Sequence, residues 1–113
     1  MGDIYEVVVE DKLFEKIKSG KCRNYIFLND RKRLQYKIGN ILVFINNDDK
    51  IAVKIENMFY FKTIKELLDM MGKEKFGYTP SQNSDVIEDS YYTSYKPEDI
   101  EKFGLVAIEF KLN

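Results

Sequence analysis

Five short segments rich in β-branched and aromatic residues constrain the fold of this 113-residue chain more than any other feature. In residues 5–9 and 106–112, apolar and charged side chains alternate, as in strands with one face toward a core. Residues 24–28 and 51–61 also have strand composition, and residues 41–45 are apolar on both faces, which predicts a central, buried strand. The connections lack the regular spacing of βαβ units. We therefore predict an α+β fold, with a small mixed or antiparallel β-barrel of about five strands and three or four short flanking helices.

Sequence signals mark the helices between and after these strands. Asp11 is expected to cap a first helix that Gly20 ends. Thr63 opens a capping box and predicts a second helix. Pro97 suits the first position of a last helix, whereas residues 84–95 predict a helix only weakly.

Length and composition indicate one globular domain that spans residues 1–113. Hydrophobic residues make up 44% of the chain and charged residues 33%, which is typical of folded proteins. No apolar run approaches the ~20 residues of a membrane-spanning helix, and the first residues lack the pattern of a signal peptide. The single cysteine, Cys22, rules out an internal disulfide. We therefore expect a cytoplasmic protein that does not associate with a membrane.

The chain contains no histidine, which removes whole classes of site. Ser-His-Asp and Cys-His nucleophile pairs need an imidazole base. Zinc and non-haem iron sites with histidine ligands are excluded as well. Catalysis here would depend on Lys, Glu, Asp, Tyr, Thr or Cys22. We predict neither a cofactor nor a metal.

Basic residues are concentrated in one stretch. Residues 11–37 contain nine basic and three acidic side chains, a net charge of +6 in a chain whose total is −1. Such a local positive field indicates an anionic ligand. Arg31, Lys32, Arg33 and Lys37 belong to a predicted loop, from which they would contact phosphates without reading sequence. A solvated surface turn is the alternative reading of the same residues.

The strongest candidate site follows the first predicted helix. Lys21 precedes a strand in which Arg23, Tyr25 and Phe27 share one face. An arginine beside aromatic rings suits the stacking of unpaired bases and contact with phosphate. Alternatively, Tyr25 and Phe27 are core residues, although Arg23 on the same face favours the rim of a cleft. RNA or a nucleotide is the predicted partner.

Two features outside the basic stretch also concern binding. Tyr91, Tyr92 and Tyr95 are expected to stack a base beside the cleft, or else to pack as one face of an amphipathic helix. The rest of the chain carries the compensating acidic charge. This acidic surface suggests an alternative function, in which the chain is an interaction or regulatory domain for a basic protein partner.

Five stretches of sequence follow one another at characteristic distances: FEKIKSGK at 14–21, LND at 28–30, YKIGNILVF at 36–44, IKELL at 64–68, and YKPEDIEKFGLVAI at 95–108. Together they resemble the ASCH domain family, a branch of the PUA-like β-barrels. The resemblance covers nearly the whole chain. It implies a barrel with a cleft lined by the helix-to-strand stretch, and a role with RNA or nucleotides. Some members of the family are small amidohydrolases that act on acylated cytidine.

The helix-to-strand stretch departs from the family pattern, which commonly reads Gly-Lys-Lys-Thr-x-Glu-x-Arg. Lys21 matches the first lysine. Cys22, Arg23, Tyr25 and Phe27 stand where the family has the second lysine, the threonine, the glutamate and the arginine. We therefore predict a binding domain without catalysis. The amidohydrolase is the alternative, and Lys21 is the one residue of this stretch that would be catalytic.

We predict that the protein does not hydrolyse N4-acetylcytidine, because the hydroxyl and carboxylate positions of the family pattern are replaced. The absorbance spectrum of N4-acetylcytidine should stay unchanged during incubation with the protein. Turnover that disappears in a Lys21→Ala variant would contradict this prediction.

Overall fold

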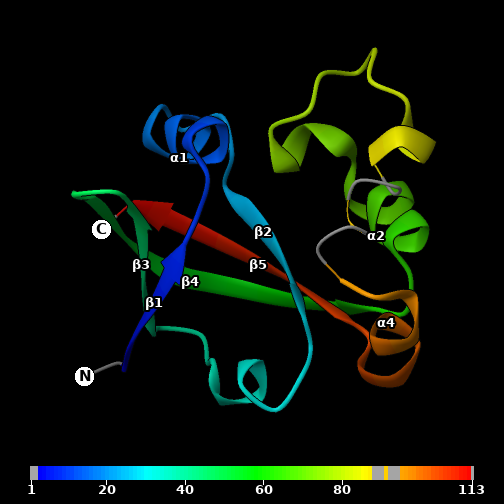
Figure 1. The fold of residues 1–113 in the computed structure, drawn as a ribbon, viewed down its shortest axis with the longest axis horizontal. Coiled ribbons are helices and arrows are strands. Elements are labelled where there is room, and N and C mark those ends of the chain that lie inside the picture. Colours follow the sequence, from blue (N-terminus) through cyan, green and yellow to red (C-terminus); the bar gives the residue numbers. More distant parts are fainter. Residues whose placement is uncertain (1–2, 88–90, 92–94, 113) are drawn as a thin grey trace.

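The computed structural model describes residues 3–87, 91 and 95–112 (Figure 1). Its elements, in chain order, are β1 (Ile4–Val8), α1 (Asp11–Lys18), β2 (Asn24–Leu28), the 3₁₀ helix η1 (Arg33–Gln35), β3 (Ile41–Asn46), β4 (Asp49–Phe61), α2 (Ile64–Met71), the 3₁₀ helix η2 (Lys73–Phe76), α4 (Pro97–Phe103) and β5 (Leu105–Leu112). Residues 84–87 and 91 are helical as well. Within the described ranges, none of the helices has the length and apolar character needed to cross a membrane.

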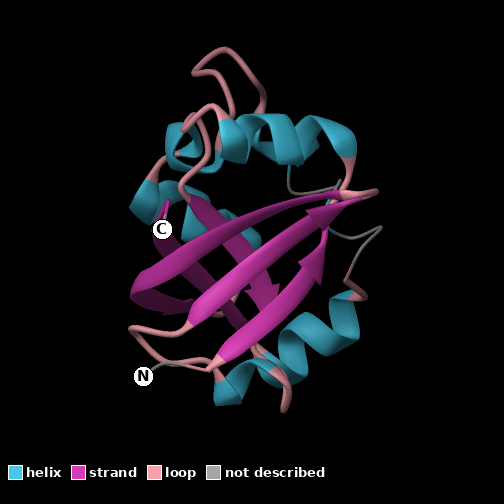
Figure 2. Ribbon diagram, turned by 90° about the vertical axis from the view of Figure 1, so that its left-hand side faces the viewer, coloured by secondary structure: helices cyan, strands magenta, loops and turns pink. Residues whose placement is uncertain are grey.

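All five strands form one mixed sheet in the order β1-β3-β4-β5-β2. β1 pairs with β3 in parallel, and the other neighbouring strands pair antiparallel. The sheet curls into a half-barrel whose two edges are β1 and β2 (Figure 1; Figure 2). The α+β class and the small, mixed, barrel-like sheet predicted from the sequence are confirmed.

The central strand is β4 and not β3. Its 13 residues pair with β3 in their first half and with β5 in their second half, and the register shifts between Ile55 and Asn57. A bulge of this kind bends a strand and increases its twist, which helps the sheet to curl. The prediction that residues 41–45 are buried on both faces is therefore wrong. Leu42 and Phe44 face the concave core and are fully buried, whereas the residues beside them lie on the convex side and are partly exposed.

The sheet has a hydrophobic core on each side of β2. The first fills the concave side, where Phe14 of α1 packs with strand residues such as Phe44. The second joins Ile26 of β2 to Leu67 of α2 and Ile100 of α4. β2 therefore contributes alternate residues to two different cores, which fixes its position at the edge of the sheet.

Aromatic rings fill the gap between the two sheet edges. The rings of Tyr5 and Tyr36 lie 4.6 Å apart, those of Tyr25 and Phe27 4.5 Å apart, and those of Phe27 and Tyr36 5.7 Å apart. Tyr25 also contacts Phe44, with 5.6 Å between ring centroids. We call these five residues the aromatic seam. Phe27 is only 1% exposed, so the structure makes it a core residue and not a surface for stacking a ligand.

The local helix signals have mixed outcomes. Thr63 caps α2 as predicted, because its hydroxyl accepts the backbone N–H three residues later at 3.0 Å. Asp11 is the first residue of α1 rather than its cap, and its carboxylate accepts a hydrogen bond from Asn46 Nδ2 at 2.8 Å. Leu112 was expected to face the core, but it is 52% exposed because it lies at the end of β5.

We predict that Phe27→Ala lowers the free energy of unfolding by about 3–5 kcal/mol, because it leaves a cavity in the seam. Urea unfolding followed by circular dichroism measures this change. Phe59→Ala is the matched control, since Phe59 is 38% exposed on β4 and should cost less. Equal losses for the two variants would show that the seam does not close the sheet.

Candidate functional site

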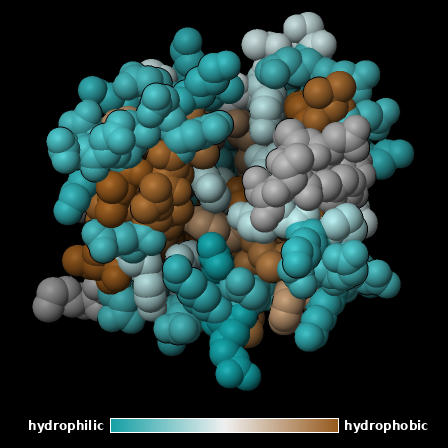
Figure 3. All heavy atoms as spheres, viewed as in Figure 1, coloured by the Kyte–Doolittle hydropathy of each residue, from teal (hydrophilic) through white to brown (hydrophobic). Residues whose placement is uncertain are grey.

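A hollow of about 630 Å³ lies between the end of β1, α1, β2 and the segment that follows α2. Figure 3 shows the face of the molecule hollowed between α1 and that segment. We call it the β2 pocket. Its lining residues are Val8, Val9, Glu10, Lys12, Leu13, Lys16, Cys22, Asn24, Tyr25, Ile26, Phe76, Tyr78, Gln82 and Tyr91. Its volume falls within the ~300–1,000 Å³ of typical small-molecule sites.

A glycine brings the far wall of the β2 pocket close to α1. Gly77, which follows η2, has a φ of +85°, a conformation that side chains rarely adopt. A Cβ at this position would lie 3.0 Å from Lys16 Cδ and 3.3 Å from Cys22 Cβ. The loop can therefore pack against the junction of α1 and β2 only because residue 77 has no side chain. The next residue, Tyr78, then reaches Lys16, whose Nζ lies 5.3 Å from the ring centroid.

Three tyrosines supply aromatic rings and hydroxyl groups to the pocket. The hydroxyl of Tyr78 donates to that of Tyr91 at 3.3 Å. Burial is the main cause that raises the pKa of Tyr91, and the neighbouring Tyr78 adds to it. Burial also raises the pKa of Tyr25, although the positive charge of Arg33 acts in the opposite direction. Tyr25 and Tyr91 therefore remain neutral hydrogen-bonding groups across the physiological pH range.

Asn24 carries the clearest sign of an unfilled interaction in the pocket wall. The residue is 3% exposed, and its Nδ2 donates to the Lys75 carbonyl of η2 at 3.3 Å. Because a carbonyl only accepts, this bond fixes which way the amide points. Asn24 Oδ1 is left buried, with no hydrogen-bond partner among the described residues. A buried unpaired acceptor costs about 1–3 kcal/mol, which makes Asn24 Oδ1 a candidate acceptor for a donor on a ligand in this pocket.

The structure separates the residues that the sequence grouped into one cleft. Tyr25 lines the β2 pocket. Lys21 is exposed in the turn after α1. Arg23 lines a different, smaller hollow of about 220 Å³ beside Lys111 and the end of β5. With Phe27 in the core, only one of the four grouped residues reaches the pocket.

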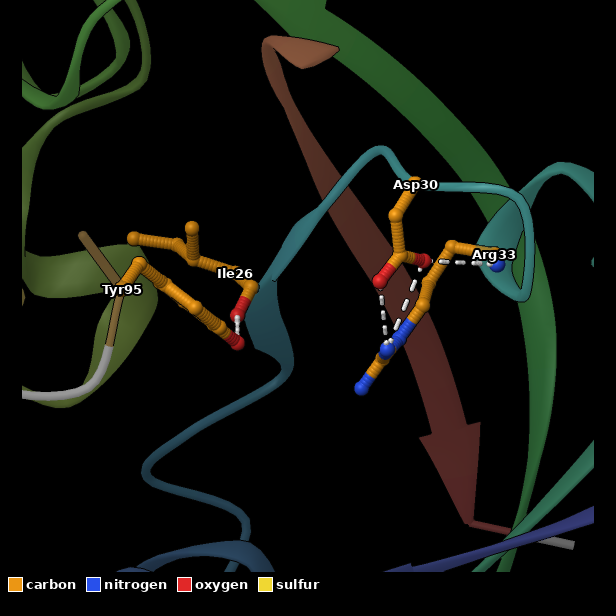
Figure 4. A network of polar contacts seen from close by, with 4 residues as sticks. All are labelled: Ile26, Asp30, Arg33 and Tyr95. Atoms are coloured by element: carbon orange, nitrogen blue, oxygen red, sulfur yellow. Dashed lines mark hydrogen bonds and ion pairs between the residues drawn. The ribbon is translucent and has the colours of Figure 1, made fainter. Parts of the chain in front are cut away.

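The predicted basic loop lies at the end of β2 remote from α1 (Figure 1). Arg31, Lys32 and Lys37 are exposed there. Arg33 is half-buried, pairs with Asp30 at 3.1 Å, and places its guanidinium 5.1 Å from the ring centroid of Phe27 (Figure 4). Arg33 therefore differs from its neighbours, because it is part of the packing around the aromatic seam.

The predicted tyrosine cluster divides between the pocket and the open edge of β2. Tyr91 lines the β2 pocket. Tyr95 is half-buried beside the second core, and its hydroxyl donates to the Ile26 carbonyl at 3.1 Å (Figure 4). Tyr92 lies outside the described residues. Of the two described tyrosines in this cluster, Tyr91 is positioned to contact a ligand in the pocket, whereas Tyr95 hydrogen-bonds the edge of β2.

Sequence reasoning missed Lys12, Lys16, Asn24 and Tyr78 as members of one site. The spacing of Lys12 and Lys16 contained a usable signal, because residues four apart share a helix face. No local signal relates Tyr78 or Asn24 to that face. Their proximity depends on how η2 packs against β2.

Solved structures of other proteins share this fold. The hypothetical protein PH0355 has a crystal structure that matches with a TM-score of 0.87 and 28% sequence identity, over 97% of this chain and 99% of that one. The solution structure of PF0455 from Pyrococcus furiosus matches with a TM-score of 0.79 and 25% identity, over 96% of both chains.

A third neighbour is more distant, the protein EF3133 from Enterococcus faecalis V583, described under the family name DUF984. Its TM-score is 0.69 at 13% identity, over 100% of this chain and 77% of that one, which supports the fold alone. No family model and no curated protein matches this chain. The neighbours therefore support a curled half-barrel compatible with a PUA-like fold and leave function to be argued from the site.

We predict that Cys22 reacts slowly with Ellman's reagent in the folded protein. It is 1% exposed, its thiol donates to the Asn24 carbonyl at 3.1 Å, and burial raises its pKa. Each unit of such a rise lowers the thiolate fraction about tenfold at neutral pH. Because the folded-state pKa lies above the unfolded one, the free energy of unfolding should also fall as pH rises above about 8.5.

The rate is measured by absorbance, with a Ser19→Cys variant on a Cys22→Ser background as the exposed control. If native Cys22 reacted with Ellman's reagent as fast as the exposed control, this result would contradict the placement of the thiol in the pocket wall.

Proposed function

We propose that this chain is a nucleotide-binding domain of the ASCH type, which takes an unpaired base of RNA or of a free nucleotide into the β2 pocket and does not transform it. One observation carries the proposal. A single pocket of suitable size combines neutral tyrosine rings, lysine ammonium groups and an unsatisfied buried acceptor. This combination matches three features of a nucleotide: its base is flat, the edges of the base form hydrogen bonds, and its phosphate is anionic.

The tyrosine rings support binding of the base. Tyr25, Tyr78 and Tyr91 reach the pocket from different parts of the chain. Every base has a π-face, and base–aromatic stacking contributes about 1–3 kcal/mol per base. Burial raises the pKa of Tyr25 and of Tyr91, so the hydroxyls of these two residues stay protonated and can both donate and accept hydrogen bonds.

The lysines of α1 support binding of the phosphate. Lys12 is exposed and Lys16 is half-buried, and both line the β2 pocket. Glu10 lines the same pocket, so the phosphate is expected beside the two lysines and away from this carboxylate. A longer RNA strand would extend toward Arg31 and Lys32 at the other end of β2, where exposed cations suit phosphate contacts.

Binding without turnover agrees with the groups in the pocket. Cys22 is buried and its pKa is raised, so the thiol stays in its unreactive protonated form. Lys21, the residue that the family resemblance would make catalytic, does not line the β2 pocket. The resemblance to ASCH domains and the half-barrel fold support the same kind of ligand.

We predict that Tyr78→Ala weakens binding of UMP and of fluorescein-labelled hexauridylate about 5- to 150-fold, which corresponds to the loss of ~1–3 kcal/mol of stacking. Calorimetry with UMP and anisotropy with the labelled strand measure the two affinities. Tyr60→Ala is the matched control, because Tyr60 is 60% exposed on β4 and remote from the pocket. A loss in the control equal to that of Tyr78→Ala would place the ligand elsewhere.

Salt dependence tests the electrostatic part of the proposal. The logarithm of the hexauridylate association constant should fall linearly with the logarithm of salt concentration, with a slope of about 0.7 for each phosphate contact on a single strand. Lys16→Ala should reduce this slope, whereas Lys65→Ala, an exposed lysine on α2, should not. Absence of binding to both probes at low salt would refute the proposed function.

A further inference from the structure

The pairing of β2 determines which of its backbone groups remain available. The Arg23 carbonyl accepts from the Phe110 N–H at 2.9 Å, and Tyr25 and Phe27 continue this series opposite β5. In an antiparallel pair, alternate residues direct both backbone groups toward the partner strand. Asn24 and Ile26 therefore direct their backbone N–H and C=O groups away from β5, toward the open edge of the sheet.

Side chains from other elements occupy part of this open edge. The Tyr95 hydroxyl donates to the Ile26 carbonyl at 3.1 Å and is hydrogen-bonded by the Leu28 backbone. The Cys22 thiol donates to the Asn24 carbonyl at 3.1 Å. A thiol is a weak donor, and a carbonyl has two lone pairs, so the Asn24 carbonyl keeps an acceptor site. Among the described residues, no side chain accepts from the Ile26 N–H.

The remaining edge groups border the β2 pocket. Asn24, Tyr25 and Ile26 are consecutive lining residues. The side chain of Ile26 belongs to the second core, while its backbone N–H faces the open edge of β2 that borders the pocket. The edge thus offers an acceptor from Asn24 and a donor from Ile26, two residues apart and pointing the same way. Asn24 Oδ1, which lacks a partner, is a second acceptor in the same wall.

We infer that the open edge of β2 reads the Watson–Crick edge of the bound base. A base N–H donates to the Asn24 carbonyl, and an adjacent ring nitrogen or carbonyl oxygen accepts from the Ile26 N–H. Each standard base has neighbouring donor and acceptor groups on this edge, and proteins that bind single strands use them. Base pairing consumes the same groups, so the ligand is an unpaired base. This inference rests on the proposed function and adds the basis on which the pocket would select an unpaired base.

Methylation of the base at one of two positions tests the inference. The probes are UMP, 3-methyl-UMP and 5-methyl-UMP, of which the last two are isomers with the same charge. A methyl group at N3 removes the donor of the Watson–Crick edge, whereas one at C5 leaves that edge intact. We expect 5-methyl-UMP to bind as UMP does and 3-methyl-UMP to bind about 5- to 150-fold more weakly, because it loses the hydrogen bond to the Asn24 carbonyl and leaves that acceptor unpaired beside a methyl group.

Equal affinities for the two isomers would overturn the inference and leave the proposed function standing. Lack of binding by all three nucleotides would overturn the inference, and lack of binding by hexauridylate as well would refute the proposed function with it. Amide hydrogen exchange provides a second readout on the same complexes. Saturation with UMP should slow exchange of the Ile26 amide, whereas the Tyr25 amide, which faces β5, is the internal control. Unchanged exchange at Ile26 in the saturated complex would also overturn the inference.

Discussion

The rest of this structure depends on how the half-barrel is closed without backbone hydrogen bonds between its edges. β1 and β2 do not pair, and the aromatic seam fills the space between them. Rings at 4.5–5.7 Å provide dispersion and edge-to-face contacts that hold the two edges at a fixed separation. In a closed barrel, the backbone N–H and C=O groups at the outer edge of β2 would be hydrogen-bonded to another strand. The open edge is what makes the β2 pocket a place where backbone groups meet a ligand.

Positive charges and partly buried aromatic rings lie together along β2. Lys16 lies over the ring of Tyr78 at one end, and Arg33 lies over Phe27 at the other, so each cation is held against an aromatic face. Tyr25 lines the β2 pocket together with Lys16 and Tyr78, and the positive charge of Arg33 acts to lower its pKa. Burial keeps its hydroxyl protonated despite the cation. A neutral, partly buried ring near cations suits a ligand with a flat apolar body and an anionic group, as in the proposed nucleotide.

Fold similarity and site chemistry contribute different parts of the functional argument. The names of the solved neighbours PH0355, a hypothetical protein, and PF0455 state no activity, so their likeness concerns the half-barrel. The case for nucleotide binding comes from the pocket wall, where η2 is attached to β2 through Asn24 and where Gly77 allows close packing. Both features are local to this site. Neither is required for a curled sheet to fold.

The types of the elements could be predicted from the sequence, because they follow from short-range chemistry. Strand 24–28, the Thr63 cap and the helix that begins at Pro97 were all predicted, since alternation, capping and fixed proline φ act within a few residues. Which side chains form the site depends on how the elements pack against one another. Tyr25 and Phe27 share a face of β2, yet one reaches the pocket and the other is buried. How deeply each side chain of β2 is buried depends on residues that are distant in the sequence. A local sequence pattern contains no information about these contacts.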